Sequence, residues 1–495
     1  MSLLIKGGDI VDGSGGPPKK GDVLIASDRI VAIGNLASYK ADRTISANGM
    51  LVVPGFLDMA SSADKRLSFF PDRSESDLLL EGITTVICGT GGISLAPLIY
   101  GSLESLSPWS KWEAMNIDWH SVSDLLSVID GSRIGVNFAS FAGYGTIKSS
   151  LSKKRRGLSK SESSVISHML SQAVREGALG ISVSSDDSAG SDMSPDEIKS
   201  FGSVLKEEKA ILAADLPFGM KHPSESVENI IKWTRGGIPT IIHHLSRAAV
   251  SEKETSASLQ AMENASVSAR ITGSACPLAM EELQLRDVIP EFIESTDAAG
   301  ISADLLKKRA IAMMEKNWPI KRLSSLWIAD SPKAEFLVGK NVAEFAENRE
   351  IGPAECFSKL VEISGGRISF YLVVQRDSSF ERILFHPRVA IESMTYGSIG
   401  GRSDFHKKLT GAFPEFLDAA NKGGLSIEKT IAKITSLPAS ACDMTKRGLI
   451  KEGFSADIVV LKDRRPEWVV VNGIESVKDG VVVTERGGRV IRRNV

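Results

Sequence analysis

Two adjacent histidines, His243 and His244, are the residues of this sequence best suited to chemistry. They follow the apolar run 239–242, which predicts a buried strand. Asp215 and Asp64 also follow predicted strands, so their carboxylates could lie beside the imidazoles and act as metal ligands or proton carriers. Two imidazoles alone are too few ligands for a tetrahedral zinc site, and packing or a backbone hydrogen bond is the more frequent role of such a pair.

Three further residues offer a constellation without a metal. Tyr144, Cys276 and Glu392 each lie near the end of a predicted strand, and together they carry a phenol, a thiol and a carboxylate. A buried tyrosine or cysteine at a strand end is more often part of the packing than of a reaction centre. Both hypotheses therefore depend on how the strands bring these side chains together.

The middle of the chain alternates apolar strands with helical patterns, which is typical of βα units and a parallel sheet. Helices are predicted at 160–176 and 195–208, and a charged, helical insertion near 280–360. Repeated units over this length favour an α/β fold of the (β/α)8 TIM-barrel class, in which sites lie at the carboxyl ends of the strands. Periodicity alone does not distinguish this barrel from a doubly wound sheet. The predicted strands are 84–88, 133–138, 179–183, 210–214 and 239–242.

Both ends of the chain show short β-rich runs broken by Gly, Asp and Asn. We therefore expect three regions: 1–55 and 441–495 as two β-rich parts, and 56–440 as the barrel.

The composition excludes several classes of partner. The formal net charge of -2 gives no reason to expect nucleic acid or an anionic membrane surface. No apolar run reaches the roughly 18 residues that span a bilayer, and the N-terminus does not resemble a signal peptide. The four cysteines are scattered without a CxxC spacing, which favours free thiols in the cytoplasm.

The run 52–58, VVPGFLD, and a series of later segments carry a resemblance to a known family. The first run resembles the start of the barrel in the amidohydrolase superfamily. The whole series, in the same order, resembles the N-acyl-D-amino-acid deacylases (D-aminoacylases), and it implies the amidohydrolase barrel with a small β-sandwich built from both chain ends. The later segments are 82–89, 92–97, 143–146, 177–182, 410–414, 434–439, 447–457 and 471–473.

That resemblance implies a zinc centre that activates water and an aspartate that acts as general acid and base. At the positions that match the family's metal ligands, however, this chain has Ala60, Ser62, Gly91 and Asp215 in place of two histidines, a cysteine and a histidine. The aspartate position is Met394, whose thioether cannot move a proton. The family's glycine-histidine-glycine-threonine segment has Tyr144 in place of histidine, whereas the metal-ligand histidine of the next motif is kept as His244. An acidic residue of the first motif is kept as Asp64.

These residues predict a degenerate D-aminoacylase-like barrel without zinc-dependent hydrolysis, which acts by binding a ligand or a partner. The alternative is a divergent amidohydrolase that acts on C–N bonds of an N-acyl amino acid or related amide, with a rebuilt site around His243 and His244. Convergence of three or more candidate side chains on one point would favour the enzyme. No metal is expected, or at most a rearranged site at His244. The expected partners are a small molecule in the barrel mouth, a second copy of this chain or an active relative.

Overall fold

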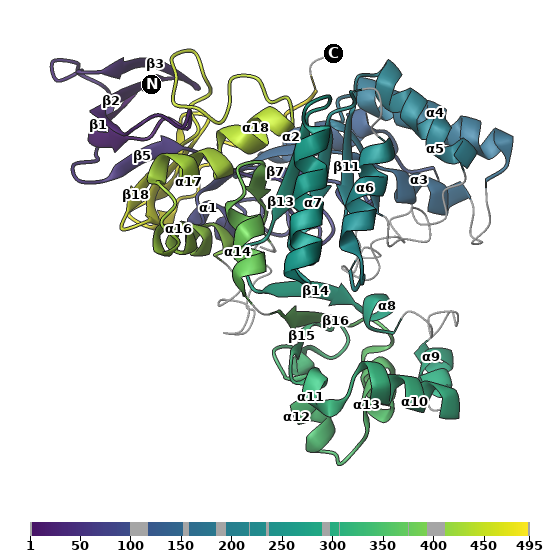
Figure 1. Cartoon of the computed structure of the whole chain (residues 1–495). Coiled ribbons are helices and arrows are strands. Elements are labelled where there is room, and N and C mark those ends of the chain that lie inside the picture. The colour runs from purple at the N-terminus through teal and green to yellow at the C-terminus, as the bar shows by residue number, and fades with distance from the viewer. Residues whose placement is uncertain are drawn as a thin grey trace.

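The computed structural model describes residues 2–99, 117–151, 158–184, 195–216, 218–233, 237–289, 298–305, 307–374, 376–393 and 411–493. Within these ranges the chain forms a β-rich domain from both chain ends, a parallel barrel surrounded by helices, and an insertion below the barrel in the view of Figure 1. None of the described helices is both long and apolar enough to cross a membrane.

The β-rich domain is built around one continuous nine-stranded sheet with its own apolar core. Its two halves join where β5 and β18 pair antiparallel, with Val53 opposite Val459. The two chain ends therefore build one β-rich domain, as predicted, and hydrogen bonding continues from the N-terminal strands into the C-terminal ones. The strands are β1 (Ser2–Ile10), β2 (Lys19–Ala26), β3 (Arg29–Gly34), β4 (Arg43–Ser46), β5 (Leu51–Pro54), β18 (Ile458–Lys462), β19 (Arg465–Val471), β20 (Ile474–Lys478) and β21 (Val481–Val482).

In the described part of the chain the barrel has eight parallel strand positions, with β8 and β9 sharing the third. Successive residues alternate between the interior and the helix layer, so Ala213 and Ile241 belong to an inner apolar cluster while Leu212 and Ile242 pack outward. This structure confirms the predicted TIM barrel. The strands are β6 (Phe56–Asp58), β7 (Ile83–Cys88), β8 (Asn137–Ser140), β9 (Ala142–Gly143), β10 (Gly180–Ser184), β11 (Ile211–Asp215), β12 (Thr240–His243), β13 (Ile271–Ala275) and β17 (Val389–Ile391).

The helices around the barrel begin where the sequence provides capping residues. Ser159 caps α4 by accepting a hydrogen bond from the Glu162 amide, and the Glu162 side chain accepts one from the Ser159 amide. The strand expected at 133–138 starts only at Asn137, because Arg133 ends α2 in the left-handed conformation. The helices are α1 (Ser76–Leu80), α2 (Val122–Ser132), α3 (Tyr144–Leu151), α4 (Lys160–Arg175), α5 (Pro195–Glu207), α6 (Pro223–Trp233), η3 (Leu245–Ala248), α7 (Glu252–Ala265), α14 (Ser378–Phe385), α16 (Ala412–Lys422), α17 (Ile427–Ile434) and α18 (Ser436–Ala441).

The insertion between β13 and β17 is a small α/β unit with a separate apolar core, and not helical throughout as expected. In its three-stranded sheet both β14 and β15 pair antiparallel with β16. The sequence of β14, MEELQ, consists of good helix formers, and pairing with β16 overrides that local preference. The elements are β14 (Met280–Gln284), α8 (Leu285–Val288), α9 (Ala298–Leu305), α10 (Lys308–Asn317), α11 (Ile320–Leu323), β15 (Leu326–Asp330), η5 (Glu335–Leu337), α12 (Val342–Glu347), α13 (Pro353–Ser364) and β16 (Ser369–Val373).

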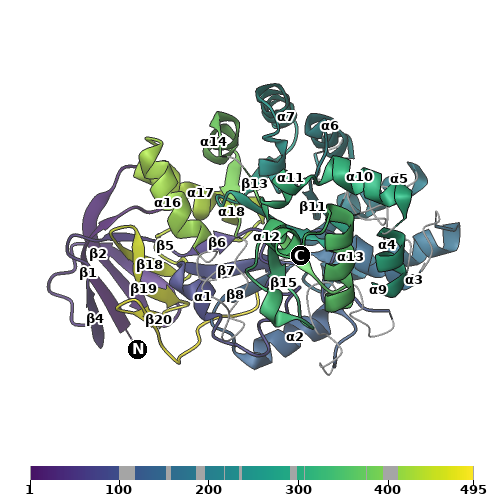
Figure 2. The same cartoon turned by 90° about the horizontal axis from the view of Figure 1, so that it is seen from below.

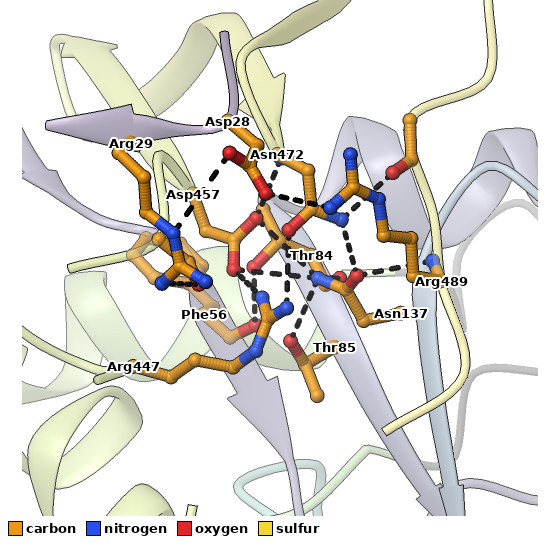
Figure 3. A network of polar contacts seen from close by, with 12 residues as sticks. Asp28, Arg29, Phe56, Thr84, Thr85, Asn137, Arg447, Asp457, Asn472 and Arg489 are labelled. Atoms are coloured by element: carbon orange, nitrogen blue, oxygen red, sulfur yellow. Dashed lines mark hydrogen bonds and ion pairs between the residues drawn. The ribbon is translucent and has the colours of Figure 1, made fainter. Parts of the chain in front are cut away.

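A polar network joins the β-rich domain to the barrel (Figure 3). The Asn137 amide of β8 donates to both carboxylate oxygens of Asp457 at 3.3 Å, and the Asn472 side chain donates to Asn137 Oδ1 at 2.6 Å. Arg447 pairs with Asp457 and donates to Asn472 Oδ1. The C-terminal tail closes the network, because the Arg489 amide also donates to Asn137 Oδ1 at 3.1 Å. This network fixes the tail at the end of the barrel opposite the insertion (Figure 1).

Buried ion pairs hold the insertion against the other end of the barrel, where its elements lie across the strands in Figure 2. Arg66 follows β6 and its side chain is 1% exposed; its Nη2 lies 2.6 Å from Glu282 Oε1 and its Nη1 lies 3.3 Å from Asp330 Oδ2. Arg247 lies 3.0 Å from Glu281 Oε2. The barrel mouth, at the carboxyl ends of the strands, is therefore enclosed by charged contacts with the insertion.

We expect Arg66→Met to loosen the insertion, because it leaves Glu282 and Asp330 as buried carboxylates without their guanidinium partner. The expected cost is about 3–5 kcal/mol. Urea unfolding gives the free energy, and hydrogen exchange should quicken within 280–284 and 326–330. In the control, Lys359→Met removes an exposed pair with Glu355 on α13 and should cost less than about 1 kcal/mol. Equal effects of the two variants would contradict this role of Arg66.

Candidate functional site at the barrel mouth

Four adjacent barrel strands direct polar side chains into the barrel mouth. Asp215 ends β11, His243 ends β12, Ser274 lies in β13, and Glu392 directly follows β17. The parallel register places Asp215 beside His243. Three of these residues come two positions after an inward-facing apolar residue, so strand alternation alone turns them inward. Those apolar residues are Ala213, Ile241 and Ala390.

Glu392 is the centre of this cluster and has no exposed side-chain surface. Its Oε1 accepts a hydrogen bond from the His244 amide at 3.1 Å and lies 2.9 Å from His244 Nδ1. Its Oε2 accepts a hydrogen bond from Ser274 and lies 3.4 Å from His243 Nδ1. Burial alone would raise the pKa of Glu392, but the His244 imidazolium and the hydrogen bonds from both histidines hold this pKa well below its usual range.

His244 bridges two carboxylates. Its Nδ1 faces Glu392, and its Nε2 lies 3.4 Å from Asp215 Oδ2. Burial opposes protonation, but the charges of Glu392 and Asp215 raise the pKa of His244 to about 10. Burial of Asp215 is likewise outweighed by the His244 charge, which lowers the pKa of Asp215 to about 2. At neutral pH His244 is therefore an imidazolium with both ring N–H groups directed at carboxylates.

The backbone of His244 supports this arrangement. His244 has a φ of 57°, in the left-handed region that costs most L-residues roughly 1–2 kcal/mol. The hydrogen bond from its amide to Glu392 holds that conformation. The same carboxylate thus sets both the backbone and the ring of His244.

His243 lies beside the bridge but makes a different set of contacts. The Ser274 hydroxyl donates its only proton to Glu392, so at 2.7 Å His243 Nδ1 must donate to Ser274 Oγ. Its Nε2 is buried and has no hydrogen-bond partner among the described residues. His243 is wholly buried, so this ring orients Ser274 and Glu392 and is closed to a ligand.

Asp64 is close to the mouth but does not join the cluster. Its carboxylate accepts hydrogen bonds from the amides of Gly89 and Lys65, each at 2.8 Å. Burial raises its pKa, although the Lys65 charge and these hydrogen bonds act in the opposite direction. Asp64 therefore fixes the loop after β6 against the end of β7.

Asp58 closes the seam between the first and last barrel strands. It accepts hydrogen bonds from the Ser393 amide at 2.8 Å and from the Ser393 hydroxyl at 2.5 Å. Burial raises the pKa of Asp58 to about 6 in spite of these hydrogen bonds. This contact places the start of the segment after β17, and with it Glu392, at a fixed height in the barrel.

Tyr144 and Cys276 do not form the expected constellation with Glu392. The Tyr144 hydroxyl donates to Glu197 Oε1 at 3.2 Å, and its ring packs edge-on against Phe201 in the helix layer. Cys276 is buried, and burial raises the pKa of its thiol well above the ordinary value. Of the three residues, only Glu392 belongs to the cluster at the mouth.

The positions that the resemblance assigns to metal ligands carry few ligand groups. Ala60 supplies a methyl group, Ser62 a hydroxyl, and Gly91 no side chain. A Cβ atom at Gly91 would lie 2.7 Å from Asp215 Oδ2, and the φ of Gly91 is +68°. The Asp215 carboxylate thus lies against the space that a cysteine at position 91 would enter. Met394 lies outside the described residues.

Among the described residues, few donor atoms at the mouth are suited to zinc. Zinc needs an imidazole nitrogen with a free lone pair, whereas the raised pKa of His244, about 10, favours protons on both of its ring nitrogens, which face carboxylates. Within the described ranges no group of three or more His, Cys, Asp or Glu side chains is arranged to hold a metal ion. Nor do His243, His244, Asp215 and Tyr144 converge on a common point. The arrangement can hold a buried positive charge between two negative ones.

The sequence identified His243, His244, Asp215 and Glu392 but not the contacts among them. It missed Ser274 entirely, because a lone serine in an apolar strand carries no signal. Strand alternation could have grouped Glu392 with His243 and Asp215, since each comes two positions after an inward-facing apolar residue.

Comparison with known proteins supports the resemblance. No family model matches the chain. It is 25% identical to the D-aminoacylase of Alcaligenes xylosoxydans xylosoxydans over 93% of this chain and 88% of that protein. It is 26% identical to the N-acyl-D-glutamate deacylase of the same organism, over 100% and 97% of the two chains.

Two solved structures share the fold over 99% of both chains. The N-acyl-D-glutamate deacylase from Bordetella bronchiseptica, complexed with zinc and a phosphonate inhibitor, superposes with a TM-score of 0.82 at 21% identity. A D-aminoacylase structure gives a TM-score of 0.81 at 22% identity. The chain is a homologue of these deacylases and has the amidohydrolase fold of D-aminoacylase.

We expect His244→Gln to destabilise the protein by about 3–5 kcal/mol near pH 6, because it removes the imidazolium that faces the buried carboxylates of Glu392 and Asp215. The folded pKa of His244, about 10, lies above its ordinary 6.5, so this stabilisation is complete below about pH 6.5 and is lost as the pH rises through about 10. The folded pKa of Asp215, about 2, lies below its ordinary 3.8. The contribution of Asp215 to the stability of the fold is therefore present above about pH 3.8 and is lost as the pH falls through about 2.

Denaturant unfolding of the wild type and the variant between pH 6 and pH 10 checks this expectation. The difference between the two proteins should shrink as the pH rises. His222→Ala is the matched control and should cost less than about 1 kcal/mol, since the exposed His222 ring forms one ion pair within the described residues, with Glu254 at 3.3 Å. A difference for His244→Gln that stays constant over this pH range would show that His244 is not held as an imidazolium.

Proposed function

We propose that this chain is a D-aminoacylase-like barrel that has lost zinc-dependent amide hydrolysis and acts by binding. Homology to the deacylases supports an amidohydrolase-like ancestry for the barrel mouth. What the mouth retains of such a site is a histidine, His244, now enclosed by Asp215 and Glu392. The ligand is a small molecule in the mouth, or the chain pairs with a second copy or with an active relative.

The observation that best supports this proposal is that the His244 ring is paired with two carboxylates, those of Asp215 and Glu392. To bind a metal, His244 would have to release a proton and break its contact with a buried carboxylate. Because the pKa of His244 is raised to about 10, losing that proton is unfavourable at neutral pH. The fixed imidazolium supplies a positive charge at this point of the barrel without a metal ion.

Substitution at the other positions supports the same proposal. Ala60 and Gly91 offer no donor atom, and the Asp215 carboxylate is directed at His244. Restoring a cysteine at position 91 would also require Asp215 to move, since the added Cβ would lie 2.7 Å from its Oδ2. The residues at positions 60, 91 and 215 are thus compatible with one another in the absence of zinc, which favours a mouth that is stable without the metal.

The alternative is a divergent amidohydrolase with a rebuilt site around His243 and His244, acting on C–N bonds of an N-acyl amino acid or related amide. The observation in its favour is the strong shift of two pKa values in the mouth, a property common at reaction centres. Buried ion-pair networks shift pKa values as well, and the two groups with shifted pKa values, Asp215 and His244, are paired with each other. A cytoplasmic location is part of the proposal and follows from the scattered free thiols.

The test combines metal content with activity. We expect elemental mass spectrometry, after incubation with zinc and removal of the excess, to find well below one zinc per chain. We expect no hydrolysis of N-acyl-D-glutamate or N-acyl-D-aspartate above the background of the uncatalysed reaction. A D-aminoacylase treated in the same way is the positive control for both measurements.

Two results would overturn the proposal. Stoichiometric zinc that His244→Gln abolishes and His222→Ala does not would establish a metal centre at His244. Hydrolysis without bound zinc that depends on His244 in the same comparison would establish the rebuilt hydrolase. Retained folding of each variant, checked by circular dichroism, separates a lost site from a lost fold.

A further inference from the structure

We propose that a basic groove at the end of the barrel opposite the insertion binds a small molecule with two or more negative charges. The basic groove is a cavity of about 400 Å³ lined by five cationic side chains, namely Arg29, Lys446, Arg447, Arg492 and Arg493. Its lining comes from the loop after α18, the start of β3 and residues 490–493. In Figure 1, α18 and the insertion lie at opposite ends of the barrel. The proposal therefore stands independently of the function proposed for the mouth.

Three segments far apart in sequence build the groove, and backbone hydrogen bonds fix each of them. The loop after α18 is held where the Ser455 amide donates to Lys446 O at 2.9 Å. The tail is held where the Ile491 amide donates to Phe138 O at 2.7 Å and the Arg493 amide to Gly177 O at 3.1 Å. Arg29, at the start of β3, forms the third side and donates to Ser455 Oγ at 3.2 Å. The cations are thus positioned before any ligand arrives.

The charges lining the groove do not balance. Its one carboxylate, Asp443, is engaged outside the groove by Arg270, whose two nitrogens lie 2.5 and 2.7 Å from the carboxylate oxygens. Arg447 is paired with Asp457. Lys446 and Arg492, by contrast, form no ion pair with any carboxylate in the described part of the chain.

Two further cations add to this excess. Arg493 donates to the backbone oxygen of Lys209 at 2.8 Å, and its charge also acts on the Glu208 carboxylate, which pairs with Arg175 at 2.6 Å. Arg29 lies 3.8 Å from Asp28, and that carboxylate is shared with Arg489 at 2.6 Å (Figure 3). Among the described residues, the lining of the groove therefore carries more positive than negative charge.

A neighbouring groove shows that this imbalance is specific. It is larger, about 580 Å³, but its lining carries four arginines and four carboxylates. Its charges cancel, and it offers no preference for an anion. The chain as a whole also has a net charge of -2, so the basic groove does not reflect a generally basic surface.

The size and donors of the groove define the ligand class. Its volume lies within the range of about 300–1,000 Å³ typical of small-molecule sites, which favours a metabolite over a macromolecule. Guanidinium groups bind planar or tetrahedral oxyanions through paired hydrogen bonds, and a lysine adds a point charge. Phosphate groups and clustered carboxylates share this chemistry.

Isothermal titration of the full-length protein with pyrophosphate at low ionic strength tests the proposal. We expect a dissociation constant below about 1 mM that weakens as salt is added, because screening reduces contacts between exposed charges. The double variant Lys446→Glu/Arg492→Glu should weaken binding by about tenfold or more, since it reverses the two cations without an ion-pair partner. Both side chains are exposed, so the fold should remain intact, as checked by thermal unfolding.

The matched control, Lys316→Glu/Lys321→Glu, reverses two exposed charges on the insertion and should change the affinity by less than about twofold. Citrate in place of pyrophosphate separates the two sources of charge: comparable binding of citrate supports a carboxylate ligand, and binding of pyrophosphate alone supports a phosphate ligand. Absence of binding for both anions at millimolar concentration would overturn the proposal. So would unchanged affinity in the double variant at the basic groove.

Discussion

A carboxylate without any exposed surface, that of Glu392, organises the mouth of this barrel. An isolated charge in such a place would be expensive, so its surroundings must supply cations and hydrogen-bond donors. They do so from two neighbouring segments: the end of β12, with the His243 ring and the His244 ring and amide, and β13, with the Ser274 hydroxyl. The left-handed backbone of His244 and the raised pKa of its ring both follow from this requirement. On the other side of the His244 ring, the Asp215 carboxylate supplies a second negative charge.

The positive charge of His244 can be compared with that of a metal ion in a metalloenzyme site. A bound divalent cation is the largest positive charge in a metalloenzyme site and holds several donors around it. In this chain a buried imidazolium between two carboxylates holds the strand ends together. Ala60 and Gly91 carry no side-chain donor atom, and the charges of Asp215, Glu392 and His244 balance one another. Removal of one of these three charges would be destabilising, because a buried charge without its partner costs several kcal/mol.

The two ends of the barrel differ in how their charges are used. At the mouth, Arg66 and Arg247 form ion pairs with carboxylates of the insertion, and His244 lies between the carboxylates of Asp215 and Glu392. At the opposite end, the loop after α18 and the tail present Lys446 and Arg492 without such partners. Charges that are satisfied internally stabilise a fold, whereas unsatisfied cations attract a ligand. The charged groups at the mouth are therefore largely paired within the protein, whereas the lining of the basic groove includes cations without an ion-pair partner among the described residues.

The sequence by itself indicated repeated βα units and β-rich chain ends, because hydrophobic periodicity is a local property of the chain. The ordered motifs carried the resemblance to D-aminoacylases, and that resemblance favoured the (β/α)8 barrel over a doubly wound sheet. The sequence also supplied the identity of His244 and Asp215. It did not determine that β14 is a strand, since MEELQ favours a helix until β16 pairs with it. Nor did it show that Glu392 faces His243 and His244 while Tyr144 turns to Glu197. Those contacts join residues roughly 50 to 150 positions apart in sequence, and only the closure of the barrel brings their side chains within hydrogen-bonding distance.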